Sequence, residues 1–276
     1  MSENTADKKL VSVIIPAYKQ EKTIVKDVQR IIDVMSQTRW AFEVIVVVDG
    51  FVDKTYEKAK KLETFDVKVV GYKTNRGKGY AVRYGMARSL GDYIVFIDSG
   101  MDINPNGVSM ILEHMQWYNA DIIVGSKRHP ASKVAYPFIR RLYSWVYSRF
   151  VRFLFGLKIT DTQSGLKVFK REVLEKVLPR LLVKEFAFDI EILAVSKYLG
   201  FERIYESPIQ IDWKNTNTNF THFLFLDKNI RNMIINTLAV FYRLRILHYY
   251  SDKSKRLWVY DKELDMKVNT GEVIND

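Results

Sequence analysis

The fold is decided by the stretch Val95-Phe96-Ile97-Asp98-Ser99-Gly100-Met101-Asp102-Ile103-Asn104-Pro105. An apolar run ends here in two carboxylates with a glycine between them, followed by a proline suited to opening a helix. This pattern predicts a buried strand that carries Asp98 and Asp102 to its carboxyl end, where open α/β sheets bind ligands. Two acids on a tight turn suit a divalent ion held against a diphosphate. The alternative is a solvated turn in which Asp98 caps the next helix.

Strand-like and helix-like patterns alternate on both sides of this stretch. Apolar runs predict strands at 10–15, 42–48, 67–70, 92–97 and 121–125, and helical spacing predicts helices at 21–35, 53–62, 80–90 and 105–118. Because every loop between them is short, the alternation predicts an α/β fold with a doubly wound, mostly parallel sheet.

Composition narrows the choice of partner. The 276 residues carry a formal net charge of +11, which points to an anionic partner such as nucleic acid, a phosphorylated small molecule or an acidic membrane surface. The absence of cysteine excludes disulfides and thiolate metal sites. No stretch approaches the roughly 20 apolar residues of a spanning helix, and the polar start at 1–9 is not a signal peptide. We therefore expect a chain that does not cross the membrane.

Further motifs follow the predicted strands in order. They are Val13-Ile14-Ile15-Pro16-Ala17-Tyr18, Asp49-Gly50, Asn75-Arg76-Gly77-Lys78-Gly79, Asp161-Thr162-Gln163-Ser164-Gly165-Leu166-Lys167 and Phe186-Ala187-Phe188-Asp189-Ile190-Glu191. The Gly-Lys-Gly element lets backbone amides and an ammonium approach phosphate oxygens at a helix start. Its glycines do not match the P-loop or the dinucleotide fingerprint, so kinase-like and dehydrogenase-like readings lose support.

In this order the motifs resemble those of family 2 glycosyltransferases, and the last two are most similar to dolichyl-phosphate glucosyltransferases and mannose synthases. The resemblance runs from about Val11 to Trp213. It implies a GT-A fold, a nucleotide-sugar donor (UDP-glucose or GDP-mannose), Mg²⁺ or Mn²⁺, and a polyprenyl (dolichyl) phosphate acceptor. We also expect a peripheral or monotopic protein on the cytoplasmic face of a membrane.

The resemblance also implies site residues. The donor is expected beside Pro16, Ala17, Tyr18, Glu21, Asp49, Lys78 and Asp98. Asp98 and Asp102 are the expected metal ligands, although Gly100 stands where family members usually carry the second acid. Asp189 is expected to bind sugar hydroxyls or to act as a base, and Glu191 to be structural.

The acceptor chemistry adds two candidates. A phosphate monoester has a second pKa near 6, so its oxygen is already anionic and needs positioning between cations more than a strong base. Arg128 and Lys167 are the candidates for holding it. Surface charge is the alternative reading for either residue.

Two segments combine basic and aromatic residues. They lie at about 134–157 and at 222–250, where bases interrupt helically spaced apolar residues. Such helices suit a membrane interface, whereas the alternatives are core helices with a solvated basic face and, less favoured, a nucleic-acid surface. We therefore expect a GT-A domain at 1–213, membrane-associating amphipathic helices at 214–250, and a charged tail at 251–276 that forms a hairpin or stays loose.

The leading hypothesis is an inverting hexosyltransferase acting at a membrane surface, with no nucleic-acid partner. The Asp-Thr-Gln-Ser-Gly motif favours UDP-glucose as the donor over GDP-mannose. The alternatives are a GDP-mannose-dependent mannose synthase, a degenerate transferase that binds nucleotide sugar without efficient turnover, and a basic binding module without chemistry.

Overall fold

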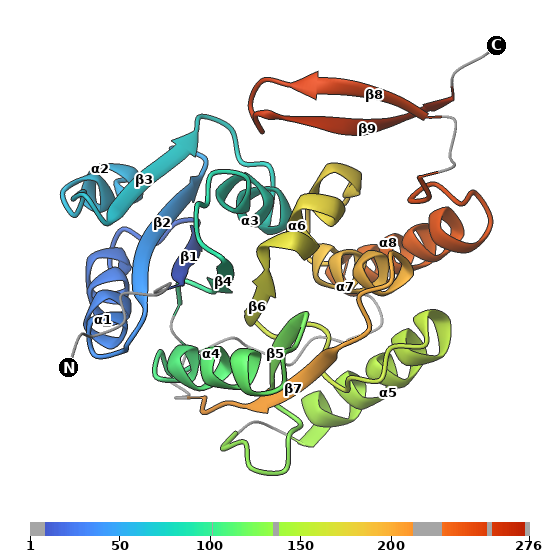
Figure 1. Ribbon diagram of the computed structural model, residues 1–276, viewed down its shortest axis with the longest axis horizontal. Coiled ribbons are helices and arrows are strands. Elements are labelled where there is room, and N and C mark those ends of the chain that lie inside the picture. The colour runs from blue at the N-terminus through green and yellow to red at the C-terminus, as the bar shows by residue number, and fades with distance from the viewer. Residues whose placement is uncertain (1–8, 101, 135–137, 212–227, 253–255, 274–276) are drawn as a thin grey trace, which may run out of the picture.

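The computed structural model describes residues 9–100, 102–134, 138–211, 228–252 and 256–273. The strands of the main sheet are β1 (Leu10–Ala17), β2 (Ala41–Asp49), β3 (Val67–Tyr72), β4 (Tyr93–Ile97), β5 (Ile122–Ser126), β6 (Leu166–Lys170) and β7 (Ile204–Pro208). They lie in the order β3-β2-β1-β4-β6-β5-β7 (Figure 1). Strand β6 is antiparallel to both neighbours and the other neighbouring pairs are parallel. The predicted mostly parallel α/β sheet is confirmed.

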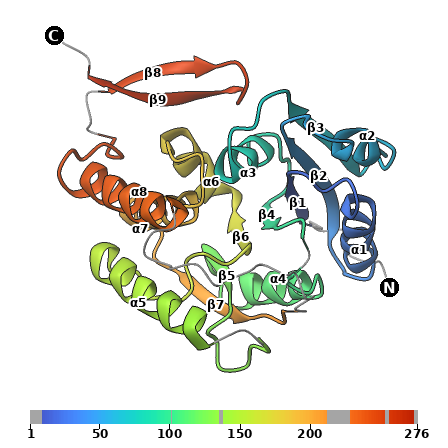
Figure 2. The ribbon, with the colours of Figure 1, turned by 180° about the vertical axis from the view of Figure 1, so that it is seen from behind.

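Helices cover both faces of this sheet (Figures 1 and 2). The helices are α1 (Ile24–Ser36), α2 (Thr55–Lys60), α3 (Lys78–Met86), α4 (Gly107–Trp117), α5 (Phe138–Phe155), α6 (Arg171–Val177), α7 (Phe188–Tyr198) and α8 (Lys228–Arg245). Helices α1, α2 and α4 contribute to one core, and α3 and α5 to α8 contribute to the other. Successive β1 side chains alternate between the two, with Val13 and Ile15 in the first core and Ile14 in the second.

Strand β6 is one of the elements that the sequence pattern did not predict, together with β7, α6 and α7. It is five residues long and carries a lysine at its second and last positions, which hides its apolar face from a search for alternation. It lies in the sheet between β4 and β5, so these two strands, which are consecutive in the sequence, are not adjacent in the sheet. This insertion places the Asp161–Lys167 motif beside the end of β4.

The C-terminal part adds α8 and a separate hairpin. Helix α8 packs against α7 and α5, and strands β8 (Arg256–Asp261) and β9 (Met266–Val273) pair antiparallel outside the main sheet. Of the two alternatives for the tail, the structure has the hairpin. Residues 214–227 of the expected amphipathic region lie outside the described residues.

Both α5 and α8 are two-faced. Val151 and Phe155 of α5, and Val240 of α8, are buried in the core, whereas other apolar side chains face outward. The exposed ones are Trp145, Val146, Phe153, Ile234, Ile235, Leu238 and Tyr242. Among the helices of the described chain, none is both long enough and apolar enough to traverse a bilayer.

Candidate active site

A first cavity, which we call the loop cavity, opens at the carboxyl ends of β1, β2 and β4. It has a volume of about 440 Å³. Its lining residues are Pro16, Ala17, Tyr18, Gln20, Asp49, Asn75, Gly77, Lys78, Ala81, Asp98, Ser99, Gly100, Glu185 and Phe186. All of the residues expected beside a donor are among them except Glu21. The Glu21 carboxylate accepts a hydrogen bond from the Lys54 amide at 3.3 Å and is not in the lining.

Asp49 shapes the loop that borders this cavity. One carboxylate oxygen accepts the amide of Arg76 at 2.7 Å, and the other accepts the Asn75 side-chain amide at 2.8 Å and the Gly77 amide at 3.0 Å. Gly77 has φ +96°, and a Cβ there would lie 2.5 Å from the Lys184 carbonyl oxygen. Only glycine fits this left-handed, closely packed position. The expected nucleotide ligand Asp49 is therefore also the group that orders the 75–79 loop.

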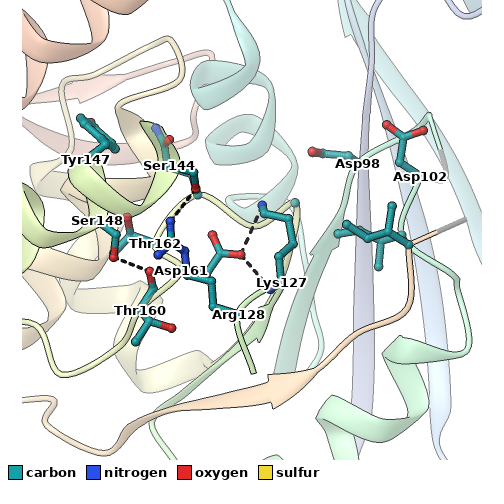
Figure 3. A pocket seen from close by; sticks show the side chains of 14 residues that line it. Asp98, Asp102, Lys127, Arg128, Ser144, Tyr147, Ser148, Thr160, Asp161 and Thr162 are labelled. Carbon is teal, nitrogen blue, oxygen red and sulfur yellow. Dashed lines mark hydrogen bonds and ion pairs between the residues drawn. The ribbon is translucent and has the colours of Figure 1, made fainter. Parts of the chain in front are cut away.

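A second cavity, which we call the arginine cavity, also has Asp98 in its lining (Figure 3). It has a volume of about 350 Å³. Its lining residues are Asp98, Asp102, Ile103, Lys127, Arg128, Ser144, Tyr147, Ser148, Thr160, Asp161, Thr162, Gln163, Gly165 and Ile211. Figure 3 shows Asp98 and Asp102 on one side of it and Arg128 with Ser144 on the other.

The two basic residues of the arginine cavity differ in their partners. Lys127 Nζ lies 3.3 Å from an Asp161 carboxylate oxygen, so its charge is compensated. Arg128 Nη2 donates to the neutral Ser144 hydroxyl at 2.7 Å, and within the described ranges Arg128 forms no ion pair with a carboxylate. A guanidinium with spare donors and an uncompensated charge suits an anion, above all a phosphate.

Asp98 lines both cavities. Its amide donates to the Gly165 carbonyl at 3.0 Å, and a Cβ on Gly165 would lie 2.1 Å from the Asp98 carboxylate. The glycine of the Asp161–Lys167 motif therefore makes room for this carboxylate. The Asp98 side chain is 45% exposed, and its two oxygens lie 2.8 and 3.0 Å from Lys78 Nζ.

Beneath Asp98 runs a chain of alternating charges. Lys78 Nζ lies 3.7 Å from Asp189, and Asp189 lies 2.5 Å from Lys167 Nζ, which also donates to the Ser164 carbonyl at 2.6 Å. Burial disfavours the Lys78 ammonium, but Asp98 and Asp189 outweigh this effect and raise its pKa. Burial lowers the pKa of Lys167, against the opposing effect of Asp189.

The position of Lys167 corrects one expectation. Its side chain is fully buried at the second position of β6 and lines neither cavity, so it does not offer its ammonium to an acceptor phosphate. Its contact with Asp189 makes it a partner of that acid instead. Asp189 itself is 4% exposed between the two lysines, beneath the cavities rather than in their lining.

Glu191 occupies a structural position. It is fully buried, and its carboxylate accepts the amides of Leu182 and Val183 and, at 2.7 Å, the Tyr250 hydroxyl. Burial raises its pKa, which these hydrogen bonds oppose. The contacts fix the 182–187 segment, which carries the cavity residues Glu185 and Phe186.

The residues near Asp98 fit a metal ion whose ligands come partly from the protein and partly from a bound substrate. In the part of the chain described, no three Asp, Glu, His or Cys side chains gather into a closed site. Asp98 and Asp102 both line the arginine cavity, and a Cβ placed on Gly100 meets none of the described residues within 4 Å, its chain neighbours aside. Mg²⁺ is commonly held by one or two carboxylates, water and substrate phosphates. Such an open donor set is what these two acids offer.

Several residues that line the two cavities were not predicted as site residues from the sequence. Asp161 and Phe186 belong to motifs that carry the family resemblance, so the sequence could have indicated that they line the site. Lys127 precedes the predicted Arg128 at the end of β5. Ser144 and Tyr147 come from α5, where a serine or tyrosine in an aromatic helix gives no signal of its own.

Comparison with known proteins places this site in a family. The model of the family described as "Glycosyl transferase family 2" matches residues 12–178, which include both acids of the Asp98 stretch. The chain belongs to glycosyl transferase family 2. It is 27% identical to the dolichyl-phosphate beta-glucosyltransferase of Dictyostelium discoideum over 77% of this chain and 68% of that protein. It is 29% identical to the undecaprenyl-phosphate mannosyltransferase of Micrococcus luteus over 72% of this chain and 82% of that protein.

The fold of this family 2 glycosyltransferase also has solved counterparts. One is the glucosyl-3-phosphoglycerate synthase of Mycobacterium tuberculosis in complex with Mn²⁺, UDP-glucose and phosphoglyceric acid. It superposes with a TM-score of 0.60 at 20% identity, covering 91% of this chain and 84% of that one. The sheet and its helices therefore have the GT-A arrangement.

Proposed function

We propose that this glycosyltransferase moves a hexose, glucose rather than mannose, from a nucleotide sugar to a polyprenyl phosphate at a membrane surface. The observation that carries the proposal is the position of Asp98, which lines both the loop cavity and the arginine cavity. The loop cavity has the Lys78 ammonium in its lining, a charge suited to a diphosphate. The arginine cavity has the Arg128 guanidinium, which pairs with no carboxylate among the described residues and suits a second phosphate. A transferase needs two such sites that meet at one point.

The reaction follows from this juxtaposition. An acceptor phosphate oxygen attacks the anomeric carbon, the bond from that carbon to the donor diphosphate breaks, and the nucleoside diphosphate leaves with the electron pair. The configuration at the carbon inverts. Arg128 orients the nucleophile, and Lys78 counters charge beside the leaving diphosphate. Asp98 and Asp102 would hold Mg²⁺ or Mn²⁺, which when bound neutralises diphosphate charge.

The relatives support the acceptor and favour glucose. The Dictyostelium relative is named for dolichyl phosphate and glucose, and the Micrococcus relative for undecaprenyl phosphate and mannose. The decisive assay supplies labelled UDP-glucose, or labelled GDP-mannose in parallel, with dolichyl phosphate in detergent, with and without Mg²⁺ or Mn²⁺. Lipid-extractable label from UDP-glucose supports the proposal. Label from GDP-mannose alone would replace glucose by mannose, and label from neither donor would refute both.

Arg128→Ala should raise the KM for the polyprenyl phosphate by roughly 30-fold, because an anionic oxygen loses its charged hydrogen-bond partner. The KM for the nucleotide sugar should change less than about threefold, since Arg128 lies outside the loop cavity. Initial rates at varied acceptor concentrations measure the effect. Arg39→Ala is the control, because Arg39 is 57% exposed and pairs with Glu113 on the surface. Equal effects of the two substitutions would remove Arg128 from the acceptor site.

The membrane surface is the remaining part of the proposal. Helices α5 and α8 pack together and expose apolar side chains, including Trp145 and Phe153, beside basic residues such as Arg149. Such a face suits an interface where rings sit among headgroups and cations meet lipid phosphates. Flotation with anionic vesicles tests it. Binding that is lost in neutral vesicles and at high salt supports a peripheral attachment, and no binding to either vesicle contradicts it.

A degenerate transferase is the second candidate, and the observation that favours it is Gly100. A Cβ added at this residue meets no atom of the described residues within 4 Å, its two chain neighbours aside. If the metal site is crippled, Gly100→Asp should raise kcat by roughly tenfold or more and lower the Mn²⁺ concentration for half activity. Ser99→Ala is the neighbouring control. No rise in kcat would mean that Asp102 already suffices as the second metal ligand, and it would reject the hypothesis of a degenerate transferase.

A further inference from the structure

The C-terminal hairpin touches the loop that borders the loop cavity. Strands β8 and β9 are joined by a turn that carries Glu263, and in Figures 1 and 2 the hairpin lies beside α3, which the 75–79 loop precedes. The family match ends at residue 178, so the hairpin lies beyond it. Nothing in the proposed reaction uses this element.

Glu263 contacts three side chains, which belong to Arg76 in the loop, Tyr80 in α3 and Arg88 just after α3. Its carboxylate forms a two-point ion pair with the Arg76 guanidinium, in which Nη2 lies 2.9 Å from one oxygen, and it accepts the Tyr80 hydroxyl at 2.8 Å. Its carbonyl accepts Arg88 Nη2 at 2.5 Å. Hydrogen bonds from Arg76 and Tyr80 lower the pKa of Glu263. Two-point arginine–carboxylate pairs are the geometry in which a partly exposed ion pair has a measurable effect.

Arg76 links this contact to the cavity. Its guanidinium lies over the rings of Tyr72 and Tyr80, with 5.3 and 4.8 Å to the ring centroids, and is directed to the hairpin. Its backbone amide donates to Asp49, and the next residue, Gly77, lines the cavity. One residue therefore joins the hairpin turn by its side chain and the wall of the cavity by its backbone.

The hairpin is itself held in place at several points. Leu264 in its turn is 1% exposed, and the Tyr249 hydroxyl donates to the Asn269 carbonyl at 2.9 Å. Arg180 lies over the Trp258 ring at 5.1 Å and pairs with Asp252 just before the hairpin. An anchored hairpin can impose a position on the loop, which a freely moving tail cannot.

We infer that Glu263 is a positioning residue, through which the C-terminal hairpin holds the 75–79 loop in the conformation that receives the nucleoside diphosphate of the donor. The inference rests on the proposed function for the identity of the ligand. Holding the loop in its bound form before the donor arrives removes an ordering cost from binding. The contact therefore sets donor affinity and leaves the acceptor site unchanged.

The test compares full-length Glu263→Gln with Lys262→Ala, a control in the same turn whose side chain is exposed. Hydrogen exchange is followed at the amides of Arg76 and Gly77, and UDP affinity by calorimetry. We expect roughly fivefold faster exchange at both amides and roughly fivefold weaker UDP binding in Glu263→Gln only. The KM for the donor should rise with it, whereas kcat and the acceptor KM stay within about twofold.

A double-mutant cycle with Arg76→Gln separates the contact from general destabilisation. If the hairpin holds the loop through the Glu263–Arg76 pair, the double variant binds UDP about as weakly as either single variant. Unchanged exchange at Arg76 and Gly77 in Glu263→Gln, or additive losses in the double variant, would overturn the inference. A wild-type chain that binds no nucleotide would refute the proposed function, and the exchange data would still decide whether the hairpin positions the loop.

Discussion

Asp98→Asn should reduce kcat for hexose transfer by at least roughly 100-fold, the scale of losing one preorganised charge at a reacting centre. Asp98 lines both cavities, and its oxygens lie 2.8 and 3.0 Å from Lys78 Nζ. The amide keeps the shape of the side chain but removes the charge that holds Lys78 and is expected to hold the metal. Since Lys78 remains in the loop cavity, UDP affinity should change less than about fivefold. Initial rates and UDP calorimetry measure the two effects separately.

The matched control is Asp33→Asn on the exposed face of α1, where the carboxylate accepts the Gln29 side-chain amide at 2.9 Å. It should leave kcat and UDP affinity as they are in the wild type. A kcat for Asp98→Asn within about twofold of wild type would exclude Asp98 from the reacting centre. A parallel collapse of UDP binding would instead make Asp98 a donor ligand whose charge is not specific to turnover.

Lys167→Met should lower the free energy of unfolding by about 3 kcal/mol, because removing one partner of a buried ion pair leaves the other charge without compensation. Lys167 is 0% exposed and Asp189 4%, with 2.5 Å between Nζ and the carboxylate. Lys78, 3.7 Å from Asp189 on the other side, limits the loss. Urea unfolding followed by circular dichroism measures the change, with the m-value compared to ensure that the same transition is observed.

Two further variants identify the cause of that loss. Lys158→Met alters an exposed lysine and should change the free energy of unfolding by less than about 0.5 kcal/mol. Lys167→Met combined with Asp189→Leu replaces the whole pair by apolar groups and should recover more than half of the loss. If the double variant is as unstable as the single one, packing around Lys167 accounts for the effect, and the ion pair does not.

The N-terminal half could be predicted from the sequence because its patterns are local. The strands through β5 and the helices through α4 were predicted in the right order and close to their observed bounds, since each buries one run of apolar side chains. The carboxyl ends of the parallel strands carry Tyr18, Asp49 and Asp98 to one edge, where all three line the loop cavity. The resemblance had placed a donor beside these same residues.

The rest of the site depends on distant contacts. Lys167 is buried because β6 is inserted between β4 and β5. The sequence of a short strand does not show that the ammonium of its lysine will pair with Asp189. The contact of Glu263 with Arg76 joins residues 187 positions apart. Hydrophobic periodicity does not predict such pairs, because it indicates which face of a helix or strand is buried and not which residues that face contacts.

The placement of β6 has a consequence for how the chain reaches its native state. Strand β4 pairs with β1 on one side and with β6 on the other, and β6 begins only at Leu166. During synthesis from the N-terminus, the β6-facing edge of β4 therefore waits unpaired until some 70 further residues have followed, an interval set by the bounds of the two strands. Non-local pairing of this kind slows folding, and an apolar edge left open in the meantime invites association with other chains. The strand that brings the Asp161–Lys167 motif beside Asp98 is thus also the strand whose late synthesis leaves one edge of β4 open.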